Sequence, residues 1–172
     1  TMIDRTDKQT PDLFGGQHAM EIAKRETMTK ARQKGTTCPC CGQFVKVYRR
    51  TINSTMARQL IKAHKEHGDR WFHTRDVVLE KSAGAGDFSK LECWGLIYRQ
   101  PHVQGLEGKR TSGMWKITAL GKDFIEGKTL VPHYAYIFNG KLLELGGVDI
   151  HIQHALGKQF DYMEIMGWKC QQ

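Results

Sequence analysis

The chain lacks the short motifs that mark the commonest classes of enzyme. Its 172 residues contain no G-x-S-x-G, no H-E-x-x-H and no glycine-rich phosphate-binding loop with a following lysine. The sequence also shows no cluster of carboxylates and no His-Asn-His arrangement of the kind that a metal-dependent nuclease needs. We therefore assign no catalytic residues and predict a protein that is not an enzyme.

Long apolar runs are missing too, and cysteine is used sparingly. No stretch approaches the roughly 20 apolar residues that cross a bilayer, so we expect no membrane partner. No leader with charged, apolar and small-residue regions opens the sequence. The five cysteines are odd in number, and three of them are crowded between positions 38 and 41, which disfavours a disulfide framework. These absences predict a reducing, cytoplasmic location.

Positive charge, by contrast, is abundant and unevenly distributed. The formal net charge is +8, which favours a polyanionic partner. Between Lys24 and Arg50 there are eight Lys or Arg residues and one acidic residue, Glu26. This segment is either a binding surface for a polyanion or simply a solvated face of the protein.

The spacing of apolar residues and of capping residues predicts an α+β fold. Helices are expected over His18–Lys34, from Asn53 or Ser54 to Gly68, over a short segment from Thr74, from Asp87 to Trp94, and after Thr118. Strands are expected at 44–50, 71–73, 96–99 and 113–117. Asn139-Gly140 lies between two apolar runs, which indicates a β-hairpin, and an amphipathic helix is expected within Val148–Met166.

Two stretches in the middle of the chain carry a family resemblance. L-E-C-W-G-L-I-Y-R at 91–99 and G-M-W-K-I-T-A-L-G-K-D-F at 113–124 resemble the recognition helix and wing of bacterial winged helix-turn-helix regulators. The order of elements also resembles that of small uncharacterised bacteriophage and prophage proteins. The resemblance covers about residues 53–130 and implies a DNA-binding protein in transcription regulation or an accessory role.

A winged helix of this kind would place the helix 87–94 in the major groove and the basic wing 99–116 against phosphates or the minor groove of double-stranded DNA. Cys93 would lie on the exposed face of that helix. The nucleic-acid-binding residues that follow from the resemblance and from the basic segment are Ser89, Lys90, Glu92, Arg99, Lys109, Arg110, Lys116, Lys46, Arg49 and Arg50.

The whole chain divides into four predicted segments. Residues 1–17 are polar and are expected to form a mobile tail. Residues 18–52 hold the basic helix and a cysteine knuckle, 53–130 the winged helix-turn-helix, and 131–172 the C-terminal hairpin and helix.

Cys38-Pro-Cys-Cys41-Gly42 resembles one knuckle of a zinc ribbon. A Cys-x-x-Cys turn supplies two thiolates of a tetrahedral zinc site, so Cys38 and Cys41 are the predicted metal ligands. The sequence leaves the other two open: the candidates are His64, His67, His73, Cys93 and the adjacent Cys40. The alternative is a turn that keeps the shape of a knuckle without binding metal.

A second hypothesis treats the chain as a protein-binding accessory factor or inhibitor without catalysis. Gln9-Thr-Pro-Asp-Leu-Phe14 resembles the peptides that dock on the bacterial sliding clamp, although Pro11 lengthens the usual spacing. Asp12, Leu13 and Phe14 would then contact a host protein. The partner would be a replication, transcription or defence complex, and the sequence leaves open whether the chain forms a homodimer.

Overall fold

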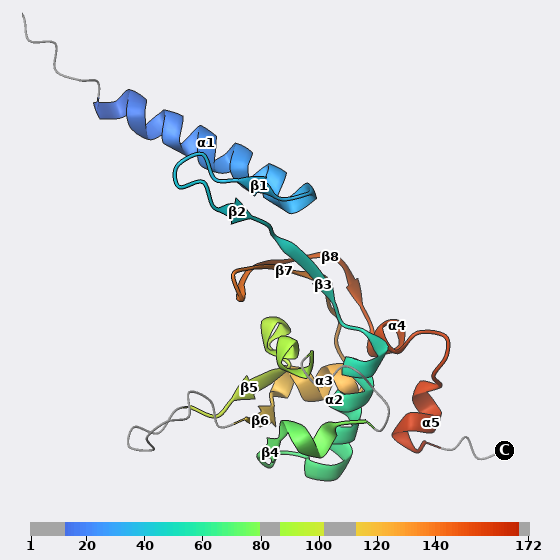
Figure 1. The fold of residues 1–172 in the computed structure, drawn as a ribbon. Helices are drawn as coiled ribbons and strands as arrows, with labels where there is room; N and C mark the ends of the chain where they lie inside the picture. The colour runs from blue at the N-terminus through green and yellow to red at the C-terminus, as the bar shows by residue number, and fades with distance from the viewer. Residues whose placement is uncertain (1–12, 80–86, 102–112, 169–172) are drawn as a thin grey trace, which may run out of the picture. The chain divides into compact units, whose positions relative to one another are not determined.

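The computed structural model describes residues 13–79, 87–101 and 113–168, and it has an α+β fold with small antiparallel sheets. The chain divides into two compact units, Thr1–Tyr48 and Arg49–Gln172, whose α-helices and strands are labelled in Figure 1. Within the described ranges, no helix is both long enough and apolar enough to cross a membrane.

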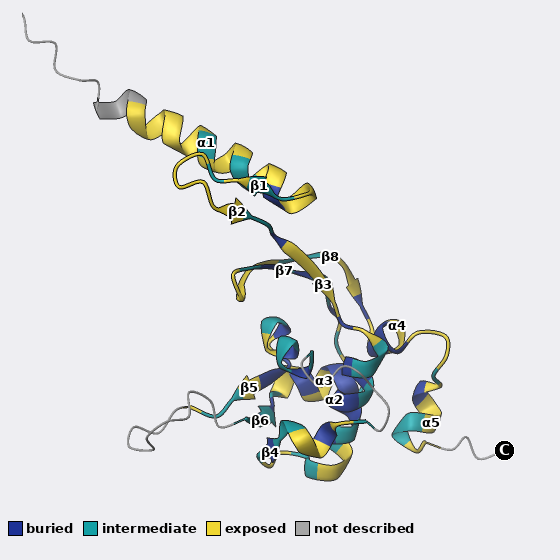
Figure 2. Ribbon diagram, viewed as in Figure 1, coloured by how far each residue is buried: buried dark blue, intermediate teal, exposed yellow. Residues whose placement is uncertain are grey.

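The N-terminal unit consists of one long helix and a small hairpin. Helix α1 (Leu13–Gln33) is followed by β1 (Thr36–Thr37), which pairs antiparallel with β2 (Phe44–Val45). Gly35 has a φ of +88°, and a Cβ at this position would collide with the ring of Phe44. Among the described residues of this unit only Ala31 and Val47 are buried, so most of α1 is exposed (Figure 2).

Two predictions for this unit were wrong in their boundaries. The helix begins at Leu13 instead of His18, inside the segment predicted to be a mobile tail, because Gly15 and Gly16 are accommodated within α1. The strand predicted across 44–50 is divided into β2 and β3 (Tyr48–Thr51). The division falls at Val47, whose side chain is buried and whose N–H donates to the carbonyl oxygen of Ala31 at 3.0 Å.

The C-terminal unit begins with a helix that has the predicted ends. Helix α2 (Ser54–His67) is capped by Asn53, whose side-chain oxygen accepts a hydrogen bond from the N–H of Met56 at 2.8 Å. Gly68, with a φ of +57°, ends it. One face of the helix enters the core, and its buried residues are Met56, Ala57, Gln59, Leu60, Ile61 and Ala63.

The strand that follows α2 belongs to a three-stranded antiparallel sheet. Its strands are β4 (Phe72–His73), β6 (Met114–Ile117) and β5 (Ile97–Arg99), in the order β4-β6-β5. The three predicted strands are therefore confirmed. Cross-strand partners include Phe72 with Trp115 and Tyr98 with Lys116.

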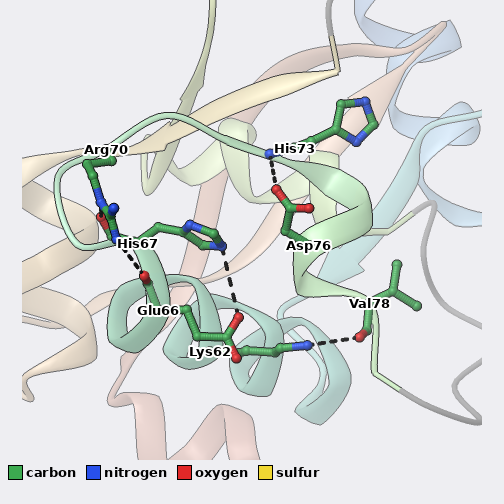
Figure 3. Close-up of polar contacts among 7 residues, drawn as sticks. All are labelled: Lys62, Glu66, His67, Arg70, His73, Asp76 and Val78. Atoms are coloured by element: carbon green, nitrogen blue, oxygen red, sulfur yellow. Dashed lines mark hydrogen bonds and ion pairs between the residues drawn. The ribbon is translucent and has the colours of Figure 1, made fainter.

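The two helices predicted beside this sheet are 3₁₀ helices. The first, η1 (Thr74–Val77), is capped by His73 and not by Thr74: the ring of His73 accepts from the N–H of Arg75, and Asp76 accepts from the N–H of His73 (Figure 3). The second is η2 (Phe88–Trp94), where Asp87 makes no side-chain capping hydrogen bond.

The spacing of buried residues explains the form of η2. Phe88, Leu91 and Trp94 are buried and recur every third residue. A 3₁₀ helix has three residues per turn, so this spacing keeps all three side chains on one face. The helix predicted from Asp87 to Trp94 is therefore present over Phe88–Trp94, and it is of the 3₁₀ type.

Helix α3 (Ala119–Ile125) follows the sheet, and Thr118 caps it as predicted. The hydroxyl oxygen of Thr118 accepts from the N–H of Gly121 at 2.9 Å. The backbone of α3 comes so close to the end of η2 that a Cβ on Gly121 would collide with the carbonyl oxygen of Leu96. Glycine is therefore required at this crossing.

The C-terminal third contains the predicted hairpin. Strands β7 (Val131–Phe138) and β8 (Lys141–Ile150) pair antiparallel around Asn139 and Gly140, whose φ angles are +48° and +74°. Strand β3 joins them in the order β3-β7-β8.

The single helix predicted within Val148–Met166 was wrong. Strand β8 runs on to Ile150, and two short helices follow, α4 (Ile152–Leu156) and α5 (Tyr162–Met166). Gly157, with a φ of +76°, ends the first helix, and the carboxylate of Asp161 caps the second by accepting from Met163 and Glu164.

One hydrophobic core joins the elements on both sides of residue 130. Phe88 makes edge-to-face contacts with Phe72 and Trp115, at centroid distances of 5.8 and 6.4 Å. The indole N–H of Trp94 donates to the carbonyl of Pro132 at 2.7 Å, which ties η2 to β7. The hydroxyl of Tyr162 likewise donates to the carbonyl of Ile125 at 2.7 Å.

Candidate nucleic-acid interface

Three cationic residues from two elements of the C-terminal unit line one small cavity of about 160 Å³. Arg49 and Arg50 come from β3, and Lys90 comes from η2. We call these three residues the basic cradle. The other lining residues are Thr51, Asn53, Met56 and Asp87.

The two elements that carry the cradle are each fixed on the C-terminal unit by neighbouring residues of the chain. Strand β3 ends at Thr51 and passes through buried Ile52 to Asn53, the cap of α2. Lys90 is half-buried in η2, which is fixed on the core by Phe88 and Leu91. Because β3 leads into the cap of α2 and η2 packs on the core, the end of β3 is held beside the beginning of η2.

Arg49 has its own support on the sheet. Its guanidinium carbon lies 4.5 Å from the centroid of the Tyr134 ring, a cation–π contact. His133 stacks on Tyr134 at 4.2 Å and lies 5.0 Å from the ring of His154. Burial, followed by the proximity of His154 and Arg49, lowers the pKa of His133. The neutral form of His133 is favoured beside Arg49, so the cradle gains its charge from the arginines and the lysine.

The cradle contains three cations and one carboxylate, Asp87. Backbone phosphates are the polyanion that a row of Arg and Lys side chains fits most readily, and Arg can bind phosphate oxygens in a bidentate manner.

The predicted reading face of residues 87–94 is less accessible than expected. Ser89, Lys90 and Cys93 are half-buried, whereas Glu92 is exposed. Burial raises the pKa of the Cys93 thiol, with the charge of Lys90 acting in the opposite direction. Glu92 is the one member of the face that is classed as exposed, and its side chain is 46% exposed.

The carboxylate of Glu92 is engaged by Arg99. The two charged groups lie 3.6 Å apart, and the guanidinium carbon of Arg99 lies 4.7 Å from the centroid of the Trp115 ring. Arg99 is therefore held between a carboxylate and an aromatic face. This arrangement supports the end of β5, and it competes with any base that Glu92 or Arg99 would contact.

Aromatic and basic side chains lie together on the face of the three-stranded sheet that points away from the hydrophobic core. Tyr98 and Lys116 are cross-strand partners, and both alternate with core residues of their strands. The ring of Trp71 makes an edge contact with Tyr98 at 5.1 Å, and the amine of Lys116 lies 5.9 Å from the centroid of Trp71. Tyr98 is 39% exposed.

Trp71 and Tyr98 were not among the residues predicted from sequence. The signal was present, because Tyr98 lies between two inward-facing positions of a strand and must point away from the core. An exposed aromatic ring beside a lysine offers nucleic acids a stacking surface and a positive charge.

Several predicted residues cannot be placed in this interface. Lys109, Arg110 and Asp12 lie outside the described residues. Leu13 and Phe14 form the beginning of α1. Lys46 belongs to the N-terminal unit, where its amine lies 5.4 Å from the centroid of the Tyr48 ring.

The predicted metal ligands Cys38 and Cys41 lie at the tip of the β1–β2 hairpin. The N–H of Cys38 donates to the carbonyl of Gln43 at 2.8 Å, and the N–H of Gly42 donates to the carbonyl of Cys38 at 2.9 Å. Cys38 is half-buried, Cys40 and Cys41 are exposed, and all three are free thiols. Hydrogen bonding from the backbone of Cys41, and then from that of Cys40, lowers the pKa of the Cys38 thiol.

The histidines considered as further ligands have other contacts within the C-terminal unit. His64 lies 3.9 Å from a carboxylate oxygen of Glu126, and His67 stacks on Phe72 at a centroid distance of 5.3 Å. His67 also lies 3.9 Å from Glu66, and His73 caps η1 (Figure 3). In the described part of the chain, no three His, Cys, Asp or Glu side chains gather into a group that could hold a metal ion.

Comparisons of this chain with protein-family models, with curated proteins and with solved structures found no match. The fold, the basic cradle and the sheet face that carries Trp71, Tyr98 and Lys116 are therefore the features that bear on function.

Proposed function

We propose that this chain is a DNA-binding regulatory or accessory protein whose C-terminal unit works as a winged helix-turn-helix. The order α2, β4, η1, η2, β5, β6, α3 supports this reading, since a short strand and two helical elements follow α2 and precede the antiparallel pair β5 and β6, which would form the wing. The basic cradle carries the proposal, because Arg49, Arg50 and Lys90 converge on one cavity beside the element that would face the groove.

The contacts of the cradle are expected to position the DNA backbone. Phosphate contacts supply affinity but no sequence information. Base readout would depend on Ser89, Lys90 and Glu92, and Glu92 is already paired with Arg99 at 3.6 Å. The proposed activity is therefore binding with strong salt dependence and modest sequence preference.

Titration of a fluorescent random duplex of about 20 base pairs, followed by anisotropy, tests the proposal. The double variant Arg49→Glu with Lys90→Glu should lower affinity on the order of tenfold or more, because it replaces two phosphate-binding cations with repelling carboxylates. The matched control is Lys141→Glu with Lys158→Glu, which makes the same change in net charge at two exposed lysines of the same unit that do not line the cradle. Its affinity should stay within about twofold of that of the unmodified protein.

Equal losses in the cradle variant and in the control would mean that general charge, and not the cradle, determines binding. Absence of binding by the unmodified protein at low salt would favour the other function considered from sequence, docking on a protein complex.

A further inference from the structure

Three side chains form a row across the outer face of the three-stranded sheet. Tyr98 of β5 is the cross-strand partner of Lys116 of β6. In the register of β4 on β6, Phe72 pairs with Trp115, so the adjoining residues Trp71 and Lys116 also face each other. Successive side chains of a strand point to opposite faces. Because Phe72 and Trp115 are buried, Trp71 and Lys116 lie on the outer face. We call Trp71, Tyr98 and Lys116 the aromatic row.

The rings of Trp71 and Tyr98 lean toward each other across the row. Two strands on either side of a third are separated by roughly 10 Å. The two ring centroids are nevertheless only 5.1 Å apart, and the ring planes make an angle of 69°. The rings therefore form a corner, in which a flat group that stacks on one ring meets the other ring at its edge. Tyr98 is exposed and Trp71 is half-buried, so the corner opens toward solvent.

Lys116 adds a positive charge to this corner. Its amine lies 5.9 Å from the centroid of the Trp71 ring, near the outer limit of about 6 Å for a cation–π contact. Within the described residues, no ion pair joins Lys116 to a carboxylate. The amine is therefore available to an anion that approaches from outside. Exposed Arg70 adjoins Trp71 in the chain and adds to the positive charge.

An unpaired nucleotide has the two groups that this corner can bind. Its base offers a flat face to an aromatic ring, and its phosphate offers a negative charge to the lysine. In a duplex each base is stacked between its neighbours, whereas the unpaired bases of a single strand can stack on protein side chains. The net charge of +8 likewise favours a polyanion over a neutral apolar partner.

We propose that the aromatic row is a binding site for single-stranded nucleic acid. One unpaired base stacks in the corner between Trp71 and Tyr98, and a neighbouring phosphate contacts Lys116. None of these three residues lines the cavity of the basic cradle, so the two sites use different side chains. The proposal therefore does not depend on duplex binding by the cradle.

The test uses the full chain and a fluorescent oligothymidylate of about 12 nucleotides, followed by anisotropy at low salt. An abasic strand of the same length carries the same phosphates without bases, and it should bind about tenfold more weakly. Binding of unlabelled oligothymidylate should also quench tryptophan fluorescence, and Trp71→Phe should remove most of this quenching while binding persists. Equal affinity for the two strands, or no binding of either, would overturn the proposal and leave the row to a protein partner.

Aromatic variants assign the site. Trp71→Ala and Tyr98→Ala should each weaken oligothymidylate binding about tenfold, whereas Tyr98→Phe, which keeps the ring, should stay within about twofold. The matched control is Trp168→Ala, which removes another exposed aromatic ring of the same unit and should have no effect. Unchanged affinity in both alanine variants of the row, or an equal loss in the control, would contradict the assignment.

The same variants separate this proposal from the function proposed for the cradle. Trp71→Ala and Tyr98→Ala should leave affinity for the random duplex within about twofold, because a duplex offers no unpaired base. An equal loss for duplex and single strand would overturn the assignment to unpaired bases. If Trp71→Ala fails to fold, Tyr98→Ala and the abasic strand still decide the question.

Discussion

The two units of this chain bury their side chains to very different extents. Of the described residues in the N-terminal unit, Ala31 and Val47 are buried, whereas the C-terminal unit fully buries large side chains such as Phe72, Phe88 and Phe124. Apolar burial is the main driving force of folding. The C-terminal unit therefore has a core of its own, whereas α1 and its hairpin are held together by very few buried side chains.

The largest effect should follow removal of a central aromatic side chain. Phe88→Ala deletes a ring that contacts both Phe72 and Trp115 and has no exposed surface. We expect the free energy of unfolding of the C-terminal unit to fall by about 3–5 kcal/mol. Chemical denaturation followed by tryptophan fluorescence measures it, and a loss below about 1 kcal/mol would contradict the packing described for η2.

Replacing one glycine of each unit with alanine should change stability in opposite directions, which tests the difference between the units directly. Gly121→Ala places a Cβ against the carbonyl oxygen of Leu96, so the C-terminal unit should lose about 1–3 kcal/mol of stability. Gly16→Ala, on α1, meets no atom within 4 Å and should raise helix content instead, by about 0.5–1 kcal/mol in local stability. Circular dichroism during thermal unfolding reports both changes. Equal destabilisation by the two substitutions would contradict the difference in packing between the C-terminal unit and α1.

Two capping positions provide the next test. Asn53 caps α2 through its side chain, and Asp87 makes no such bond to η2. Asn53→Ala should cost about 1 kcal/mol in the free energy of unfolding. Asp87→Ala should cost less, and denaturant midpoints of the two variants should differ in that order. The reverse order would mean that Asp87 supports η2 through a contact other than a cap.

The smallest predicted effect compares two cysteines. The pKa of the Cys38 thiol is lowered, first by the backbone N–H of Cys41, and the pKa of the Cys93 thiol is raised by burial. Because the thiolate is the reactive form, iodoacetamide should alkylate Cys38 several-fold faster than Cys93 in metal-free protein near pH 8. Mass spectrometry of the digested protein gives both rates, and raising the pH should narrow the difference. Faster alkylation of Cys93 would contradict the two local environments.

Sequence reasoning succeeded where the determinants are local. The caps at Asn53 and Thr118 and the turn at Asn139-Gly140 depend on residues a few positions apart, and all three are confirmed. The strands of the three-stranded sheet were found for the same reason, because each alternates inward and outward residues.

It failed where the outcome depends on tertiary packing. The break at Val47 follows from a hydrogen bond to Ala31, and no local pattern reveals that partner. In η2, the recurrence of Phe88, Leu91 and Trp94 predicted a helix but not its type, and the spacing of three residues fits the 3₁₀ helix that the structure has. The single C-terminal helix was predicted across Gly157, whose positive φ ends α4.

In the candidate interface, some residues were predicted from the sequence and others were missed. Arg49, Arg50 and Lys90 were each predicted from charge or from the family resemblance, but their convergence on one cavity depends on how η2 and β3 pack. Trp71 and Tyr98 were missed, since their meeting on the outer face of the sheet requires the register of β5 on β6.

The most direct test of the central claim, that the basic cradle binds the nucleic-acid backbone, is the dependence of duplex affinity on salt. The logarithm of the association constant should fall linearly with the logarithm of salt concentration, by about 0.9 for each phosphate that a cation of the protein neutralises. We predict that Arg49→Ala with Lys90→Ala makes this slope shallower by roughly two, while the melting temperature falls only by the small amount expected from loss of the contact between Arg49 and Tyr134. A slope equal to that of the unmodified protein would show that the cradle does not contact phosphate, and it would contradict the account.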